Sequence, residues 1–179
     1  MHECTPYLLN TVNLNSMLYL LLIISFLSPD FVYSGTTSCR DAWVVYYGSC
    51  YLFAHDQLLT FTEAEEFCKH HSSHLVHIDN EHENNFLRQF VIHFRTNAWW
   101  IGLTDVLVEG EWQWIDTNTD AKYLQWGPNE PDNVAVEEDC AAIALSQGLH
   151  GLNWADTVCS NKLQPICEEN VSTENEIIG

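Results

Sequence analysis

Hydrophobic residues in the first third of the chain follow a strand pattern and then a helix pattern. Between Cys39 and Phe53, Trp, Val, Tyr and Phe dominate, and Gly48-Ser49 interrupts them. Aromatic and β-branched residues favour strands and glycine favours turns, so this segment predicts a β-hairpin. Further along, the apolar spacing changes to that of helices.

Two helices are predicted from their starting residues and their apolar faces. Thr60 and Glu63 have the spacing of a capping box, in which each side chain bonds the other residue's backbone N–H. Asn80 and Glu83 open the second helix in the same way. The first helix has its apolar face at Phe61, Ala64, Phe67 and Cys68, and the second at Phe86, Leu87, Phe90, Val91 and Phe94. Both helices are expected to end before residue 97.

The second half of the chain contains short strand-like runs and one long irregular stretch. The runs are 99–103, 112–114 and 143–145, and the stretch from Asp116 to Cys140 is rich in Asn, Asp, Gly, Pro and Glu. A long loop inside a compact domain is usually functional. We expect an α+β fold with a core that includes Trp43, Trp100, Trp112 and Trp114.

Charge and composition limit the class of partner. The 179 residues include 25 Asp and Glu against 6 Lys and Arg, a formal charge of −19. Such a polyanion repels nucleic acids and anionic lipid headgroups, so we expect no nucleic-acid partner. With 46% hydrophobic residues and no internal repeat, the chain should fold as one domain.

The N-terminus has the features of a signal peptide. Residues 17–27 form an apolar run of 11, and Val32 and Ser34 suit cleavage before Gly35. A membrane span needs about 20 apolar residues, so a membrane anchor is the weaker alternative. No Lys or Arg precedes Arg40, which departs from the usual signal, and Met17 is an alternative start. We predict a signal peptide over 1–34, a secreted domain over 35–170, and a short acidic tail over 171–179. In the exported chain, Asn170 begins a glycosylation sequon.

Six cysteines remain after cleavage, because Cys4 lies in the predicted signal peptide. An even set in an exported domain indicates disulfides, although six cysteines allow 15 pairings. The spacings lack the close pairs of a structural zinc site.

The acidic residues gather near the end of the irregular stretch. Five carboxylates fall within ten residues (Glu130, Asp132, Glu137, Glu138 and Asp139), and Asp156 follows Trp154. Such oxygen ligands suit Ca²⁺, whereas the alternative is a solvated acidic loop. Pro131 favours the metal site because an X-Pro bond, particularly a cis one, can fix both flanking carboxylates.

These residues together resemble the C-type lectin-like domain family, in its long form with six cysteines. The resemblance is carried by Cys39, Cys50, Cys68, Trp100-Ile101-Gly102-Leu103, Trp112, Trp114, Glu130-Pro131-Asp132, Glu138-Asp139-Cys140, Trp154-Ala155-Asp156, Cys159 and Pro165-Ile166-Cys167-Glu168. It implies two helices, small antiparallel sheets and a long calcium-binding loop. It also implies the disulfides Cys39–Cys50, Cys68–Cys167 and Cys140–Cys159.

The resemblance further implies two sets of calcium ligands. The principal site would use Glu130, Asp132, Glu138 and Asp156, which would also accept hydrogen bonds from a bound sugar. Ala155 stands where the family has Asn. An auxiliary site would use Asp105, Glu109, Asn133, Glu138 and Asp139.

The chain departs from both usual sugar-specificity patterns. Asp132 stands where mannose-type sites have Asn, and Glu130 where galactose-type sites have Gln. A carboxylate accepts hydrogen bonds but cannot donate them when ionised. Val134 also stands where galactose-type sites place an aromatic ring. The choice between the two sugar types stays open.

His70, His71, His74 and His77 offer a second metal hypothesis, but no carboxylate or cysteine completes a zinc pattern, and a solvated helix end is favoured. No nucleophile elbow or catalytic triad is recognisable, so we expect no enzyme.

The sequence therefore predicts a secreted, calcium-dependent lectin that recognises surface glycans, as in innate immunity. The alternative is a calcium-dependent structural protein that binds mineral or a protein partner, as similarity to the perlucins would imply. Homo-oligomer formation is left open, and no membrane span is expected.

Overall fold

The computed structural model describes residues 39–94, 98–134, 137–145 and 151–171. The predicted signal peptide with Cys4, Ser172 of the sequon and the tail beyond Val171 lie outside the described residues. Within the described part of the chain, no helix is long and apolar enough to span a membrane.

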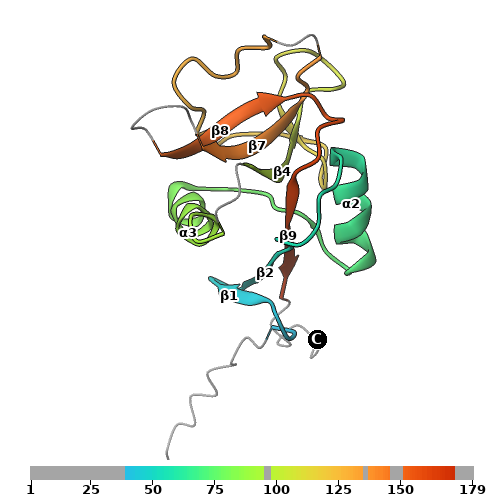
Figure 1. Cartoon of the computed structure of the whole chain (residues 1–179), viewed down its shortest axis with the longest axis vertical. Helices are drawn as coiled ribbons and strands as arrows, with labels where there is room; N and C mark the ends of the chain where they lie inside the picture. The colour runs from blue at the N-terminus through green and yellow to red at the C-terminus, as the bar shows by residue number, and fades with distance from the viewer. Residues whose placement is uncertain (1–38, 95–97, 135–136, 146–150, 172–179) are drawn as a thin grey trace, which may run out of the picture. The chain divides into compact units, whose positions relative to one another are not determined.

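The domain begins with the predicted hairpin. Strand β1 (Val44–Tyr46) pairs antiparallel with β2 (Ser49–Phe53) around Tyr47 and Gly48, both of which have positive φ. Strand β9 (Gln164–Asn170) lies antiparallel to β2 and to the short β3 (His74–Leu75). Strand β2 therefore lies between β1 and β9, the first and last strands (Figure 1).

Both predicted helices are confirmed, with different caps. Helix α2 (Phe61–His70) has the full capping box, in which Glu63 N–H donates to Thr60 and Thr60 N–H donates to Glu63. Helix α3 (Glu81–Val91) is capped by Asn80, which accepts from Glu83 N–H. Here the Glu83 carboxylate accepts from Asp79 N–H instead of completing the box.

The remaining strands carry the long loops. Strand β4 (Ala98–Thr104) is antiparallel to β5 (Gln113–Trp114) and β7 (Cys140–Leu145) and parallel to β9. Strand β6 (Thr119–Asp120) pairs with β5, and β8 (Leu152–Thr157) pairs with β7. The predicted strands are confirmed, except that Trp112 precedes β5. Strands β3, β6, β8 and β9 were not predicted.

Strand β4 divides the core into two clusters. Trp99 packs with Leu87 and Val91 of α3, and Trp100 packs with Phe61 and Cys68 of α2. Figure 1 accordingly shows the two helices on opposite sides of β9. Trp100, Trp112 and Trp114 are buried as expected, whereas Trp43 is half-buried beneath the Arg40 guanidinium.

Gly102 allows β4 to approach the chain at β3 closely. A Cβ atom there would lie 2.8 Å from Leu75 O, and Gly102 N–H donates to Val76 O. A larger residue would push β4 away, so the glycine is required by packing rather than by its backbone angles.

Three disulfides close the domain with the expected pairing. They join Cys39 to Cys50, Cys68 to Cys167 and Cys140 to Cys159. The α+β architecture is confirmed as well.

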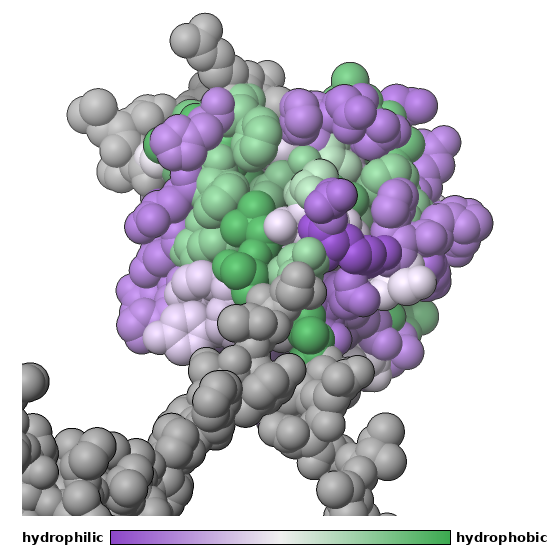
Figure 2. All heavy atoms as spheres, turned by 90° about the horizontal axis from the view of Figure 1, so that it is seen from below, coloured by the Kyte–Doolittle hydropathy of each residue, from purple (hydrophilic) through white to green (hydrophobic). Residues whose placement is uncertain are grey.

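The end of the domain that carries the β1–β2 hairpin has an apolar recess of about 530 Å³, lined in part by Leu52, Phe67 and Phe94. Figure 2 shows hydrophobic residues in the middle of this face with hydrophilic residues around them. The long loops lie at the opposite end (Figure 1).

Candidate metal centre

Backbone hydrogen bonds along β8 position the start of the acidic loop. Trp154 N–H donates to Gln125 O, and Gly127 N–H donates to Trp154 O at 2.8 Å. Glu130 N–H then donates to Gly127 O. The loop therefore turns beside β8, which brings Glu130 close to Asp156. The Glu130–Pro131 peptide bond that follows is cis.

Three carboxylates converge at this turn. Glu130, Asp132 and Asp156 each offer an oxygen within 4.8 Å of the other two. Asp156, 7% exposed, accepts from the backbone N–H groups of Asp132 at 3.1 Å and Asn133 at 2.8 Å. Asp132 in turn accepts from Val134 N–H. The backbone thus holds two of the three carboxylates without any cationic side chain.

The charges at this cluster are uncompensated. Burial, a hydrogen bond with Asp156 and the charge of Asp132 raise the pKa of Glu130 to about 7. Among the described residues, no Lys, Arg or His nitrogen lies within 4.0 Å of the three carboxylates. A bound divalent cation would remove this repulsion and favour the ionised form of Glu130.

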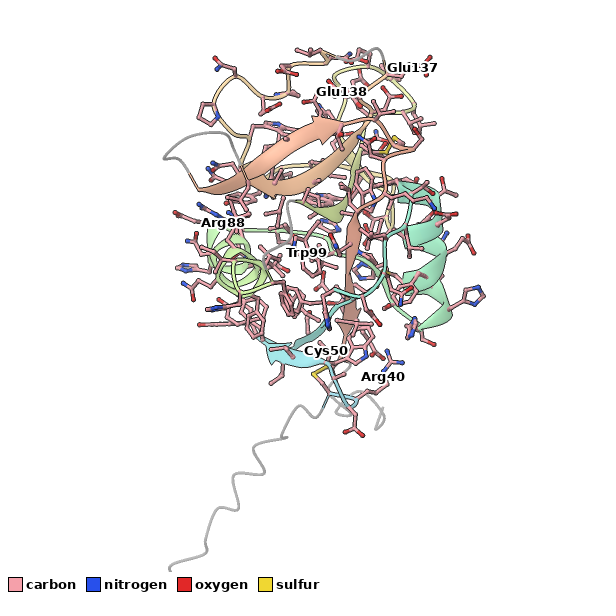
Figure 3. All side chains as sticks on the ribbon, in the orientation of Figure 1. Arg40, Cys50, Arg88, Trp99, Glu137 and Glu138 are labelled. Carbon is pink, nitrogen blue, oxygen red and sulfur yellow. A yellow bond between two sulfur atoms is a disulfide. The ribbon has the colours of Figure 1, made fainter. Side chains whose placement is uncertain are left out.

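Glu138 lies next to the cluster rather than within it. Its N–H donates to Asn133 Oδ1 at 3.2 Å, and its charge contributes to the raised pKa of Glu130. Its carboxylate is not in the group within 4.8 Å. The structure therefore brings together three of the four predicted principal ligands, with Glu138 at the same end of the domain (Figure 3).

Asp105 is the best placed of the five predicted auxiliary ligands. It is 3% exposed, and its Oδ2 accepts from Gly110 N–H at 2.8 Å. Its Oδ1 is buried without a hydrogen-bond partner in the described part of the chain. Burial raises the pKa of Asp105, and the charges of Glu109 and Asp139 raise it further. An unpartnered buried carboxylate oxygen is costly unless a cation or water meets it.

Two of the other auxiliary residues, Glu109 and Asp139, lie near enough to Asp105 for their charges to raise its pKa. Asp105 N–H donates to Asp139 O at 3.2 Å, and Glu109 is exposed on the same loop. The Asn133 side-chain oxygen already accepts from Glu138 N–H. The charges of Asp105, Glu109 and Asp139 therefore act on one another. Their carboxylates do not form a group as close as that of Glu130, Asp132 and Asp156.

A third acidic group was not recognised from the sequence. Tyr51 Oη donates to Glu83 Oε1 at 2.8 Å and lies 3.4 Å from Glu168 Oε1, and all three side chains are buried. They line a pocket of about 500 Å³ between the hairpin and α3. Burial raises the pKa of Glu83 to about 7. The sequence pattern indicates only a helix-capping role for Glu83, and nothing in the sequence pairs it with Glu168.

The histidines occupy separate environments. His71 Nδ1 lies 2.8 Å from Phe67 O, and His74 Nδ1 lies 2.9 Å from Leu75 O. His77 instead contacts the Asp116 carboxylate at 3.1 Å and stacks on Trp114. Burial lowers the pKa of His77, but Asp116 outweighs it and the net shift is upward. The solvated-end hypothesis therefore does not describe His77. No described group of metal-ligand side chains includes these histidines.

Comparisons with known proteins agree with this architecture. The family model for the lectin C-type domain matches residues 57–169. Mouse (Mus musculus) asialoglycoprotein receptor 1 is 34% identical over 148 residues, which cover 79% of this chain and 48% of that receptor. The chain thus spans about half the length of this curated relative.

Solved structures show the same fold. The mouse scavenger receptor C-type lectin carbohydrate-recognition domain is 30% identical with a TM-score of 0.67, and the match covers 75% of this chain and all of that domain. The cow CD23 domain, determined in the presence of a GlcNAc2Man3 oligosaccharide, is 28% identical with a TM-score of 0.66 over 76% of this chain and 98% of that one. With its family match, its fold and its three disulfides, the chain belongs to the C-type lectin domain family.

Proposed function

We propose that this protein is a secreted, calcium-dependent lectin that recognises surface glycans, as in innate immunity. The observation that carries the proposal is the convergence of Glu130 and Asp132, on the acidic loop, with Asp156, on the neighbouring strand β8, in a C-type lectin domain. The raised pKa of Glu130, about 7, and the unpartnered Asp105 Oδ1 both support the proposal, because a bound cation would stabilise the ionised form of each carboxylate.

The proposed principal site consists of Glu130, Asp132, Glu138 and Asp156, and each supplies carboxylate oxygens of the kind that Ca²⁺ prefers. The auxiliary site would use Asp105, Glu109, Asn133, Glu138 and Asp139, with Asp105 Oδ1 as its buried ligand. Bound calcium would act as a Lewis acid for two neighbouring sugar hydroxyl oxygens. The ligand carboxylates would accept hydrogen bonds from the same hydroxyl groups.

The donor set favours weak binding of neutral sugars. Asp132 and Ala155 have no side-chain amide to donate to a sugar oxygen, so two hydrogen bonds of about 1 kcal/mol each are missing. Four carboxylates around one divalent ion also leave the site negative, which disfavours anionic sugars. We therefore expect multivalent presentation to be needed for firm attachment. Mannose-type and galactose-type ligands both remain candidates.

Calorimetric titration with calcium, followed by a glycan array with and without chelator, tests the proposal. We expect calcium binding and a glycan signal that the chelator abolishes. Asp56→Asn is a suitable control because Asp56 is exposed in the turn after β2, away from the loops. Failure to bind calcium at millimolar concentration would contradict both metal sites.

A second candidate function is a calcium-dependent structural protein that binds mineral or a protein partner. The charge favours it: without residues 1–34, the chain keeps 23 acids against six bases, a formal charge of −17. Two calcium ions would leave about −13. Calcium binding without any chelator-sensitive glycan signal would support this second function.

Processing and modification complete the proposal. We expect cleavage after Ser34, which N-terminal sequencing of the exported protein would detect. Asn170 is exposed at the end of β9, and its Oδ1 accepts from Ser49. We expect a glycan on Asn170, visible as a mass loss on deglycosylation. This position lies at the end of the domain opposite the acidic loops, so the glycan would leave the site open (Figure 1).

A further inference from the structure

Three consecutive aliphatic side chains are exposed on the loop between β4 and β5. Val106 is 60% exposed, Leu107 76% and Val108 50%. Single exposed aliphatic residues are ordinary on protein surfaces, but a contiguous group usually marks a contact surface. The charged side chains of Asp105, Glu109 and Glu111 stand on either side of this aliphatic triplet.

Backbone hydrogen bonds fix the triplet in its exposed position. Asp105 Oδ2 accepts from Gly110 N–H at 2.8 Å and closes the loop around it. Glu111 N–H donates to Val108 O at 2.9 Å. Gly110 has a φ of 78°, a backbone angle that residues with a side chain rarely adopt. The exposure therefore follows from the fold of the loop.

A recess of about 200 Å³ adjoins the triplet. Val106 and Leu107 form part of its wall, and Ile115 lies on another part. Thr104, Glu111, Gln113 and Asn118 supply the polar part of the wall, so the recess and the triplet together make a strip that is aliphatic along Val106, Leu107 and Ile115. A hydrocarbon chain could lie along such a strip, because burial of aliphatic surface is favourable and needs no hydrogen-bond partner.

The strip is connected to the principal site by successive hydrogen bonds. Asp105 N–H donates to Asp139 O, the neighbouring Glu138 N–H donates to Asn133 Oδ1, and Asn133 N–H donates to Asp156 Oδ2. Val134, 80% exposed, adds an aliphatic side chain two residues beyond Asp132. Exposed aliphatic side chains therefore stand on both loops that carry the predicted calcium ligands, and these loops share one end of the domain (Figure 3).

We propose that the ligand is a neutral glycolipid, with its sugar at the calcium site and its hydrocarbon chain against Val106, Leu107 and Val108. This inference rests on the proposed function and names its ligand class. The formal charge of −17 without the predicted signal peptide, and the carboxylates beside the triplet, repel anionic lipids but not an uncharged chain. Apolar contact also offsets the two missing amide donors of the sugar site.

Calorimetry on the full exported chain in calcium tests this with methyl and octyl glycosides of mannose and galactose, kept below the micelle concentration. For one of the two sugars, we expect the octyl glycoside to bind about tenfold more tightly than the methyl glycoside. Leu107→Gln should reduce that preference to about threefold or less without changing calcium affinity. Ile92→Gln is the matched control, since Ile92 is 61% exposed at the end of α3.

Each outcome separates the inference from the function on which it rests. Equal binding of methyl and octyl glycosides would overturn the glycolipid inference and leave the lectin function intact. An octyl preference that survives in Leu107→Gln, or that survives chelation, would overturn it as well. Calcium binding with no response to any of the four glycosides would also overturn the glycolipid inference, and the glycan array with and without chelator would then decide the lectin function separately.

Discussion

Asp132 decides which hydrogen bonds the principal site can offer. Its Oδ1 accepts from Val134 N–H, a contact that an asparagine could keep. Asp132→Asn would also give the loop an amide N–H for a sugar oxygen. One added hydrogen bond of about 1 kcal/mol corresponds to about fivefold in affinity. We therefore expect stronger binding to mannose-type ligands and weaker binding of calcium, because one ligand charge is lost.

Glycan-array titrations of Asp132→Asn beside the Asp56→Asn control measure this change. The control removes a carboxylate of the same size and charge from an exposed turn. A mannose signal in Asp132→Asn that does not exceed that of the control would show that the missing donor is not what limits sugar binding.

Glu83 gives the domain a pH-dependent stability. Its pKa rises from 4.5 to about 7 because folding buries the carboxyl group. A carboxyl group with a raised pKa stabilises the fold fully below pH 4.5, and this contribution is lost as the pH rises through about 7. The shift corresponds to about 3 kcal/mol between these limits. Glu83→Gln should therefore flatten the fall in stability between pH 5 and pH 8.

Thermal melts in chelator, recorded across that pH range for both proteins, give the difference in slope. Chelator is needed so that calcium does not contribute. Parallel curves for the native chain and Glu83→Gln would contradict the assignment of the titration to Glu83.

At the scale of elements, the N-terminal cap of α2 has a measurable share in stability. Thr60 Oγ1 accepts from Glu63 N–H and satisfies one free backbone donor of the first turn. Thr60→Ala should lower the free energy of unfolding by about 1 kcal/mol. Thr62→Ala is the matched control, because Thr62 is exposed within the same first turn. Urea denaturation of both variants measures the effect, and equal losses would mean that the cap bond contributes nothing.

Elements set by local interactions were predictable from the sequence. The hairpin turn at Gly48 and the caps at Thr60 and Asn80 depend on neighbouring residues, and all three are confirmed. Strands β8 and β9 were missed because their short runs become strands through pairing with β7, β2 and β4. Local sequence carries little information on such distant pairing.

The sequence indicated the side chains of the candidate site but not the backbone hydrogen bonds that hold them in place. The family resemblance named Glu130, Asp132 and Asp156, which the fold brings together. The two backbone N–H groups that hold Asp156 leave no sequence signal, since every residue except proline has one. The unpartnered oxygen of Asp105 and the contact between Glu83 and Tyr51 likewise depend on burial in the folded chain.

For the whole molecule, calcium should act as a stabilising ligand. A ligand that binds the folded state alone adds about 2.7 kcal/mol to stability at a hundredfold excess over its Kd. Calcium would also relieve repulsion within a chain whose formal charge is −17 without residues 1–34. We expect melting temperature to rise with calcium and to fall again with chelator. Magnesium at equal concentration is the control for charge screening, and an equal rise with magnesium would contradict specific sites.

The N-terminal hairpin and the final strand lie side by side at one end of the domain. Cys39 is bonded to Cys50, Cys50 is opposite Glu169, and Val171 N–H donates to Gly48 O. The acidic loops lie at the other end (Figure 1). Either terminus can therefore serve as a tether without shielding the loops. Copies fixed to a bead or joined tail to tail would point their loops outward. Several loops could then bind one surface at the same time.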